Sequence, residues 1–107
     1  MTQEEIRKAV NALLCCGTFE MQTNGYDISV HHNRMFVDES AIARVNGNKL
    51  FVTVVNNRNK TTIELLNALP NVNIKRDEFG TFYLNEMVWI GGWHCAVDDL
   101  YKHDEDL

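Results

Sequence analysis

The chain has 107 residues, of which 45% are hydrophobic, with 15 acidic and 10 basic side chains and a single proline. This length fits one domain with one core, and the composition excludes a disordered or fibrous protein. No apolar run reaches the roughly 18 to 20 residues that a membrane-spanning helix needs. The first residues lack the basic and apolar regions of a signal peptide, and the three cysteines are an odd number, so we expect a protein of the reducing cytoplasm.

Residues 2–16 have the pattern of an amphipathic helix. Thr2, followed by Glu5 three positions later, forms a capping-box motif at its start. Gly17 stands where a glycine commonly ends a helix. One apolar stripe at helical spacing gives this helix a face for the core, and it consists of Ile6, Ala9, Val10, Leu13 and Leu14.

After Gly17 the hydrophobic period changes to two, which predicts strands. Asn24-Gly25 and Asn46-Gly47 are strong signals for hairpin turns, and the polar residues 32–34 predict a further turn between them. Residues 49–55 are largely apolar on both faces. We therefore expect this strand in the centre of the sheet, with cover on both sides.

The second half of the chain predicts a short helix, a hairpin and a tail. Thr61 with Glu64 repeats the capping-box pattern, and the helix that follows ends near Pro70. A closing hairpin has its turn at Asn85-Glu86. The tail from Trp93 is expected to form one further helical turn before its acidic end.

These elements predict an α+β fold with an N-terminal helix, a mostly antiparallel sheet of several strands and one short internal helix. No internal repeat or low-complexity tract divides the chain. We expect residues 1–107 to form a single domain, with an acidic C-terminal tail that starts at about residue 97.

The candidate metal ligands and nucleophiles lie next to each other in sequence. Structural zinc sites usually take ligand pairs two to four residues apart, whereas adjacent residues on a strand point to opposite faces. We therefore expect no metal site and no cofactor, and we interpret the cysteines as core thiols. No nucleophile elbow, P-loop or dinucleotide motif is present, so we expect no catalytic residues and no enzyme activity. The side chains considered as ligands are Cys15, Cys16, His31, His32, His94 and Cys95.

Charge is distributed unevenly along the chain. Residues 44–76 contain six bases against the single acid Glu64, whereas residues 77–107 contain eight acids and the single base Lys102. A basic segment suits contacts with phosphates, and nearby aromatics could stack on bases if they are exposed and not part of the core. The candidate nucleic-acid-binding residues are Arg44, Lys49, Arg58, Lys60, Lys75 and Arg76, and the aromatics near them are Phe79, Phe82 and Tyr83.

The acidic tail is a second candidate surface. Its acids surround Leu100 and Tyr101, and apolar anchors within an acidic rim suit a partner with a basic groove. An ordinary solubilising terminus is the alternative interpretation. The candidate partner-binding residues are Trp93, Asp98, Asp99, Tyr101, Asp104 and Glu105.

Two motifs between Thr61 and Gly92 carry a family resemblance. A helix that starts with Thr and contains Leu-Asn-x-Leu is followed by Gly-x-x-Tyr-Leu-Asn and a Trp. This third of the chain resembles small accessory proteins of tailed bacteriophages. The resemblance implies a cytoplasmic protein, made in an infected bacterium, that binds and inhibits a host component such as a CRISPR or other nuclease-type defence complex.

The leading hypothesis is a non-catalytic, phage-encoded, anti-CRISPR-like inhibitor that acts by protein–protein contacts. Its partner would be a host protein or ribonucleoprotein complex with a basic surface, and no membrane is involved. The alternative is a small nucleic-acid-binding regulator that uses the basic segment 44–76. A third hypothesis is a subunit of a homo-oligomer, such as a homodimer, or of a virion, with subunits that pair through exposed strand residues near Trp89 and Trp93.

Overall fold

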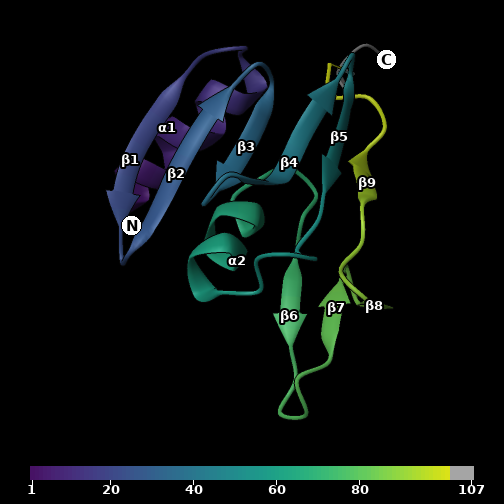
Figure 1. The fold of residues 1–107 in the computed structure, drawn as a ribbon. Coiled ribbons are helices and arrows are strands. Elements are labelled where there is room, and N and C mark those ends of the chain that lie inside the picture. The colour runs from purple at the N-terminus through teal and green to yellow at the C-terminus, as the bar shows by residue number, and fades with distance from the viewer. Residues whose placement is uncertain (102–107) are drawn as a thin grey trace.

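The computed structural model describes residues 1–101 and shows the predicted α+β fold (Figure 1). Two helices combine with a six-stranded antiparallel sheet and a separate three-stranded sheet. The helices are α1 (Gln3–Leu14) and α2 (Lys60–Asn67). The large sheet consists of β1 (Phe19–Thr23), β2 (Tyr26–His31), β3 (Arg34–Val37), β4 (Ser40–Asn46), β5 (Lys49–Val52) and β9 (His94–Val97). The small sheet consists of β6 (Ile74–Arg76), β7 (Phe82–Leu84) and β8 (Met87–Trp89).

α1 begins as predicted, with Thr2 as its N-cap. The Thr2 hydroxyl accepts the N–H of Glu5 at 3.1 Å, and the Glu5 carboxylate accepts the N–H of Thr2 at 2.8 Å. Beyond the helix, Cys16 and not Gly17 takes the left-handed conformation, with φ at 59°. The prediction for Gly17 is wrong by one position, because its N–H instead closes the last turn on the carbonyl of Ala12 at 2.7 Å.

The large sheet is an antiparallel meander from β1 to β5, and β9 adds to the other side of β5. Its first three turns are Asn24-Gly25, His32-Asn33 and Asp38-Glu39, with positive φ at every residue. This conformation matches the right-handed twist of paired strands. The turn predicted at Asn46-Gly47 comes one residue later, because Asn46 still belongs to β4.

β9 replaces the helical turn that the sequence predicts after Trp93. His94 pairs with Val52 and Val97 pairs with Leu50, so this segment extends the sheet by one strand. Without β9, β5 would present a row of unpaired backbone N–H and C=O groups at the sheet edge. β5 therefore lies inside the sheet, and Leu50 and Val52 are fully buried.

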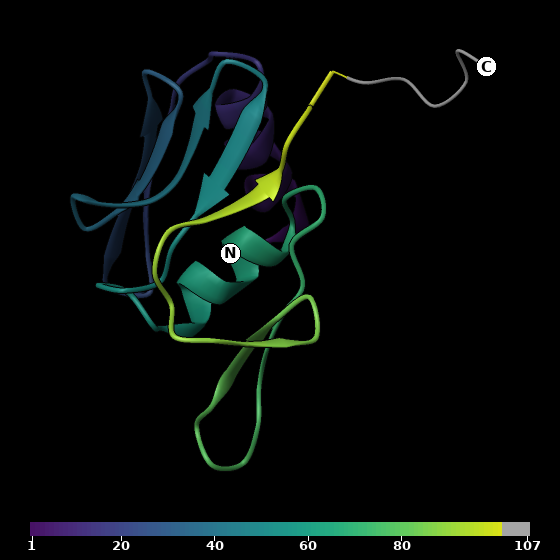
Figure 2. The ribbon, with the colours of Figure 1, turned by 90° about the vertical axis from the view of Figure 1, so that its right-hand side faces the viewer.

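Both helices pack on the same face of the large sheet (Figure 2). α1 contacts β1 to β4, and α2 contacts β4 and α1. Cover on both faces of β5 was predicted, but neither helix lies on the opposite face, where Phe51 is half-buried. The largest fully buried side chains between the sheet and the helices include Leu13, Ile28, Met35, Ile42, Leu50, Leu65 and Leu66.

α2 begins two residues earlier than predicted, because Asn59 and not Thr61 is its N-cap. The Asn59 side-chain oxygen accepts the N–H of Thr62 at 2.8 Å. Thr61 and Thr62 are buried, with 3% and 0% of their surfaces exposed, so the predicted capping box at Thr61 is wrong. The helix ends before Pro70, as predicted. Neither helix of the described residues is long and apolar enough to span a membrane.

The small sheet projects from the end of the molecule at which α2 lies (Figure 1 and Figure 2). β7 and β8 form the predicted hairpin, and its turn residues Asn85 and Glu86 have φ values of 51° and 72°. β6 pairs with the other side of β7. Residues 77–81 form the loop at the tip of this sheet, which places β6 between the loop and α2.

Candidate functional site

A basic pocket of about 240 Å³ lies where α2, β6 and β7 meet. Four of the six cations predicted for nucleic-acid contact line it, although they come from two separate segments of the chain. The remaining lining residues are apolar and form its floor. The cations are Arg58, Lys60, Lys75 and Arg76, and the floor residues are Ile63, Ile74 and Phe82.

Local structure explains how the two basic segments meet. Lys60 is the first residue of α2, and Arg58 precedes the Asn59 cap. Near the end of α2, the Asn67 side chain donates to the carbonyl of Ile74 at 3.1 Å and accepts its N–H at 2.6 Å. These two bonds hold the start of β6 beside α2, so the cations of β6 lie next to those at the start of the helix.

Two arginines lie against the ring of Phe82. The guanidinium carbons of Arg58 and Arg76 are 5.4 Å and 5.5 Å from the ring centroid, within the range of a cation–π interaction. Arg58 Nη2 also donates to the carbonyl of Ile90 at 2.9 Å. Gly91 leaves room for this approach, because a Cβ there would lie 3.2 Å from Arg58 Nη2. Arg58 is thereby fixed while most of its five N–H donors remain for a ligand.

No cation of the pocket forms an ion pair with a carboxylate of residues 1–101. The ion pairs of this part of the chain join Arg7 to Glu4 and Lys49 to Asp98, and neither involves a pocket residue. The amino end of α2 adds its partial positive charge, because the helix begins at Lys60. The pocket therefore favours an anion.

Lys49 lies apart from this pocket and forms an ion pair with Asp98. The pair joins the start of β5 to the end of β9. The hydrogen bond with Asp98 raises the pKa of Lys49, and the same hydrogen bond lowers the pKa of Asp98. One residue of the predicted basic surface thus neutralises one residue of the predicted acidic surface.

Arg44 also lies outside the pocket, on the face of the large sheet that the helices leave open. Its guanidinium carbon is 5.0 Å from the ring centroid of Phe51 and 4.9 Å from that of Trp93. The structure therefore joins a residue of the predicted basic surface to Trp93 of the predicted acidic one. Nothing in the sequence indicates this contact, because nearly half of the chain separates the two residues.

The acidic candidate surface is described in part. Asp98, Asp99 and Tyr101 are exposed, and the Asp99 carboxylate accepts the N–H of Tyr101 at 3.2 Å. Tyr101 exposes 57% of its surface and is available to a partner. The predicted contacts at Asp104 and Glu105 lie outside the described residues.

Of the three aromatics predicted near the cations, Phe79 alone is open to a stacking base. It exposes 84% of its surface in the loop at the tip of the small sheet. Phe82 exposes 4% of its surface beneath the two arginines, which confirms the alternative interpretation of this residue as part of the core. Tyr83 is half-buried, and its hydroxyl donates to Asp77 at 3.2 Å.

The cysteines do not form part of the core, contrary to the prediction. Cys15 and Cys16 are exposed, because α1 ends before them and Cys16 turns the chain away from the helix. Cys95 is half-buried on β9. Within the part of the chain that the structure describes, no group of three or more His, Cys, Asp or Glu side chains is arranged to hold a metal ion.

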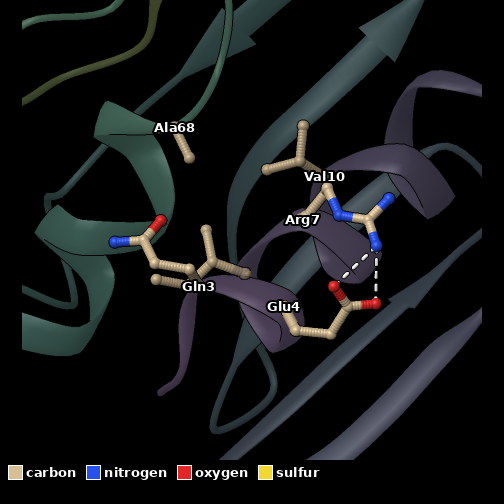
Figure 3. A pocket seen from close by; sticks show the side chains of 6 residues that line it. Gln3, Glu4, Arg7, Val10 and Ala68 are labelled. Atoms are coloured by element: carbon tan, nitrogen blue, oxygen red, sulfur yellow. Dashed lines mark hydrogen bonds and ion pairs between the residues drawn. The ribbon is translucent and has the colours of Figure 1, made fainter.

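A second pocket, of about 330 Å³, lies between α1 and α2 and has fewer charged groups available to a ligand (Figure 3). Its two charged residues, Glu4 and Arg7, bond to each other at 2.6 Å. This hydrogen bond lowers the pKa of Glu4. The charges are thus committed to each other, and the rest of the lining consists of Gln3, Ile6, Val10 and Ala68.

Among the described residues, β8 is an edge strand of the small sheet, and exposed apolar side chains lie on it and at Ile90 just after it. Met87, Val88 and Ile90 expose 74%, 69% and 84% of their surfaces. Trp89 is half-buried, and its Nε1 donates to the carbonyl of Gly92 at 3.0 Å. The exposed side chains lie where the sequence predicts an oligomer contact, and an apolar sheet edge of this kind suits a protein partner.

Comparison with known proteins finds no counterpart, since no family model, no curated protein and no solved structure matches this chain. The resemblance to accessory proteins of tailed bacteriophages therefore stays a prediction from the motifs between Thr61 and Gly92. The candidate function rests on the geometry of the basic pocket and on the exposed surfaces around it.

Proposed function

We propose that the protein binds nucleic acid and that the basic pocket holds the phosphates. The observation that carries this proposal is the convergence of Arg58, Lys60, Lys75 and Arg76 on one pocket without a carboxylate partner in residues 1–101. Phosphate contacts from lysine and arginine supply most of the affinity of non-specific nucleic-acid binding. The buried ring of Phe82 keeps two of these cations in place between binding events.

The net charge of −5 is compatible with this proposal, because the excess of acids lies in residues 77–107. The acid that follows the pocket most closely is Asp77, and its carboxylate is engaged within its own loop. It accepts the N–H groups of Phe79 and Thr81, both at 2.9 Å, and the hydroxyl of Tyr83 at 3.2 Å. These bonds stabilise the loop at the tip of the small sheet and disperse the charge of Asp77.

The proposal predicts a steep dependence of affinity on salt. If the four cations each contact a phosphate, the logarithm of the binding constant should fall with the logarithm of salt concentration with a slope of about −2.8 for a single strand and about −3.6 for a duplex. Raising the salt from about 50 mM to about 200 mM would then weaken single-strand binding about 50-fold. Fluorescence anisotropy of a labelled oligonucleotide measures this slope directly.

The test replaces Arg58 and Lys60 together by Ala. Loss of two phosphate contacts should lower the affinity and make the slope shallower by about 1.4 for a single strand. The matched control is Arg7→Ala with Lys8→Ala, which removes the same charge from the exposed side of α1 and should leave both quantities unchanged. An affinity that does not depend on salt, or equal losses in both double variants, would overturn the proposal.

A second candidate function follows from the exposed side chains outside the pocket. We propose, as in the leading hypothesis from the sequence, a non-catalytic inhibitor of a host defence or nucleic-acid-processing complex, encoded by a phage. The exposure of Asp98, Asp99 and Tyr101, together with the apolar edge of β8, supports protein contact. Such a partner would have a basic surface.

The test of this second candidate is capture of partners from a bacterial lysate, with and without nuclease. A stoichiometric protein that survives nuclease treatment is the expected result. Asp98→Lys combined with Asp99→Lys should weaken this capture and leave the fold intact, because both side chains are exposed and the Lys49–Asp98 ion pair that is lost lies at the surface, where such pairs contribute little stability. Undiminished capture by the double variant would exclude Asp98 and Asp99 as the binding surface.

A further inference from the structure

The large sheet has a face that neither helix covers (Figure 2). Side chains on one face of paired strands follow the cross-strand register. Phe36 lies opposite Ser29, Arg34 opposite both His31 and Arg44, and Arg44 opposite Phe51. The residues that bury their side chains against the helices alternate with these. The open face therefore carries the aromatic and basic side chains His31, Arg34, Phe36, Arg44 and Phe51, and Trp93 joins them from the segment before β9.

Arg44 is the centre of this face. Its guanidinium lies against both Phe51 and Trp93, at 5.0 Å and 4.9 Å from the ring centroids. Its Nε is buried and has no hydrogen-bond partner within the described residues. Arg44 is thus held by aromatic rings and not by a carboxylate, and its directly opposite neighbour on β3 is a second cation, Arg34. The charge at this position is available to an anionic partner.

Two aromatic rings of this face, those of His31 and Trp93, are accessible, whereas Phe36 and Phe51 are half-buried. The ring of His31 stacks on that of Phe36 with centroids 4.9 Å apart and an interplanar angle of 18°. His31 is exposed, and Trp93 exposes 47% of its surface. The acids Glu20 and Asp27 share the face only at its β1–β2 end. The basic and aromatic part therefore extends from His31, at the end of β2, to Trp93.

We propose that this open face binds the unpaired bases of a single-stranded nucleic acid, and this inference rests on the proposed function of the basic pocket. Exposed aromatic and arginine side chains on a sheet can stack on bases that are not stacked in a duplex. Duplex bases are already stacked on each other, so they would gain nothing from these rings. The pocket supplies phosphate contacts, and the face supplies the preference for single strands.

One short segment connects the two surfaces. The carbonyl of Ile90 accepts a hydrogen bond from Arg58 of the pocket at 2.9 Å. Three residues later, Trp93 lies against Arg44 of the open face. A strand that follows this segment would pass from the phosphate site to the stacking site without leaving the protein surface.

Trp93 supplies a direct readout of stacking. Trp89→Phe leaves Trp93 as the only tryptophan, because the chain has two. An oligothymidylate of about 15 nucleotides should quench its fluorescence, whereas heparin, a polyanion without bases, should bind the pocket without quenching. A duplex of the same length should bind more weakly than the single strand in anisotropy.

The affinity test uses the otherwise unmodified chain, so it does not depend on how Trp89→Phe folds. Trp93→Ala should weaken oligothymidylate binding at least about fivefold and leave heparin binding unchanged. Val88→Ala is the matched control, since Val88 is an exposed apolar residue of the small sheet and lies off the face. It should bind both ligands like the parent.

The possible outcomes separate the two proposals. Binding of both ligands without quenching, with Trp93→Ala unaffected, would overturn the stacking face and leave the pocket intact. Failure to bind either ligand would overturn the proposed function itself. A protein partner that survives nuclease and is lost in Trp93→Ala would assign the open face to protein contact and also overturn this inference.

Discussion

Gly91→Ala tests whether the junction between the large sheet and the basic pocket is built as described. Gly91 is buried and has a φ of +98°, a conformation that L-residues rarely adopt. Its carbonyl accepts the N–H of Val54 at 2.9 Å and the hydroxyl of Thr53 at 2.7 Å. These bonds tie the segment before β9 to the end of β5. A substitution at Gly91 should therefore disturb both of these hydrogen bonds.

The expected loss of stability has two main sources. A side chain at this positive φ costs about 1–2 kcal/mol. Its Cβ would lie 3.0 Å from Val54 Cγ2, and Val54 is fully buried, so relief of the clash requires a shift in the core that costs about 1–3 kcal/mol. Arg58 lies 3.2 Å away and is a flexible, exposed side chain, so it should move and lose its bond to Ile90. We expect Gly91→Ala to lower the free energy of unfolding by about 2–5 kcal/mol.

Urea unfolding followed by circular dichroism measures this difference. A loss of about 3 kcal/mol should lower the unfolding midpoint by at least about 1 M urea. Gly92→Ala is the control, because Gly92 has no neighbouring atom within 4 Å of an added Cβ and no positive φ. It should remain within about 0.5 kcal/mol of the parent. Equal midpoints for the two variants would refute the geometry assigned to Gly91, and with it the account of how Arg58 is held.

Two further predictions concern stability. Hydrogen bonds from the Thr81 N–H and its loop neighbours lower the pKa of Asp77 below 3.8, so the stability that this carboxylate contributes is present above about pH 4 and is lost as the pH falls through the lower pKa of the folded state. Urea midpoints of Asp77→Asn and the parent should differ at about pH 5, and the difference should shrink as the pH is lowered further. A difference that does not change with pH would contradict this. Asn59→Ala removes the N-cap of α2 and should cost about 1 kcal/mol, whereas Asn59→Asp should keep the cap; thermal unfolding would contradict the assignment if both variants melt like the parent.

The features that were predicted correctly depend on residues close together in sequence. The capping box of Thr2 and Glu5 and the turns at Asn24-Gly25 and Asn85-Glu86 each form within a few residues. Local conformational preference therefore determines them. Errors of one or two residues, as at Gly17 and Thr61, occur where more than one nearby residue can end or begin a helix and tertiary packing selects one.

β9 could not be predicted in the same way. Its pairing with β5 joins residues more than 40 positions apart, and the segment itself shows only a short apolar run, Cys95, Ala96 and Val97, without a strand alternation. The unpaired edge of β5 determines its structure, and that edge exists only once the meander has formed. The contact between Arg44 and Trp93 could not be predicted for the same reason. Trp93 reaches the open face only because the next residues pair with β5 as β9.

The charge distribution along the sequence predicted the components of the candidate site but not their grouping. The six cations of segment 44–76 appear as one cluster in sequence, yet Arg58, Lys60, Lys75 and Arg76 line the pocket while the other two lie elsewhere. Strand alternation decides this separation, because it directs Arg44 to the open face. Lys49 does not contribute to the pocket, because it pairs with Asp98, 49 positions away. No local sequence pattern indicates this pairing.

Nucleic-acid binding by the basic segment and partner binding by the acidic tail look incompatible in the sequence, because the acids would repel phosphates. In the folded protein the two hypotheses are compatible. Asp98 forms an ion pair with Lys49, and the carboxylate of Asp77 accepts hydrogen bonds within its own loop. Both acids therefore interact with nearby groups of the protein, which weakens their repulsion of a phosphate backbone. The pocket and Arg44 retain their positive charge, because the ion pairs of the described residues do not include them. Two charges from opposite blocks of the chain, Lys49 and Asp98, therefore pair between β5 and β9, whereas the pocket cations and Arg44 have no carboxylate partner among the described residues. An anionic strand approaching the basic pocket meets cations first, which is why the salt dependence of binding, and not the net charge of the chain, decides between the hypotheses.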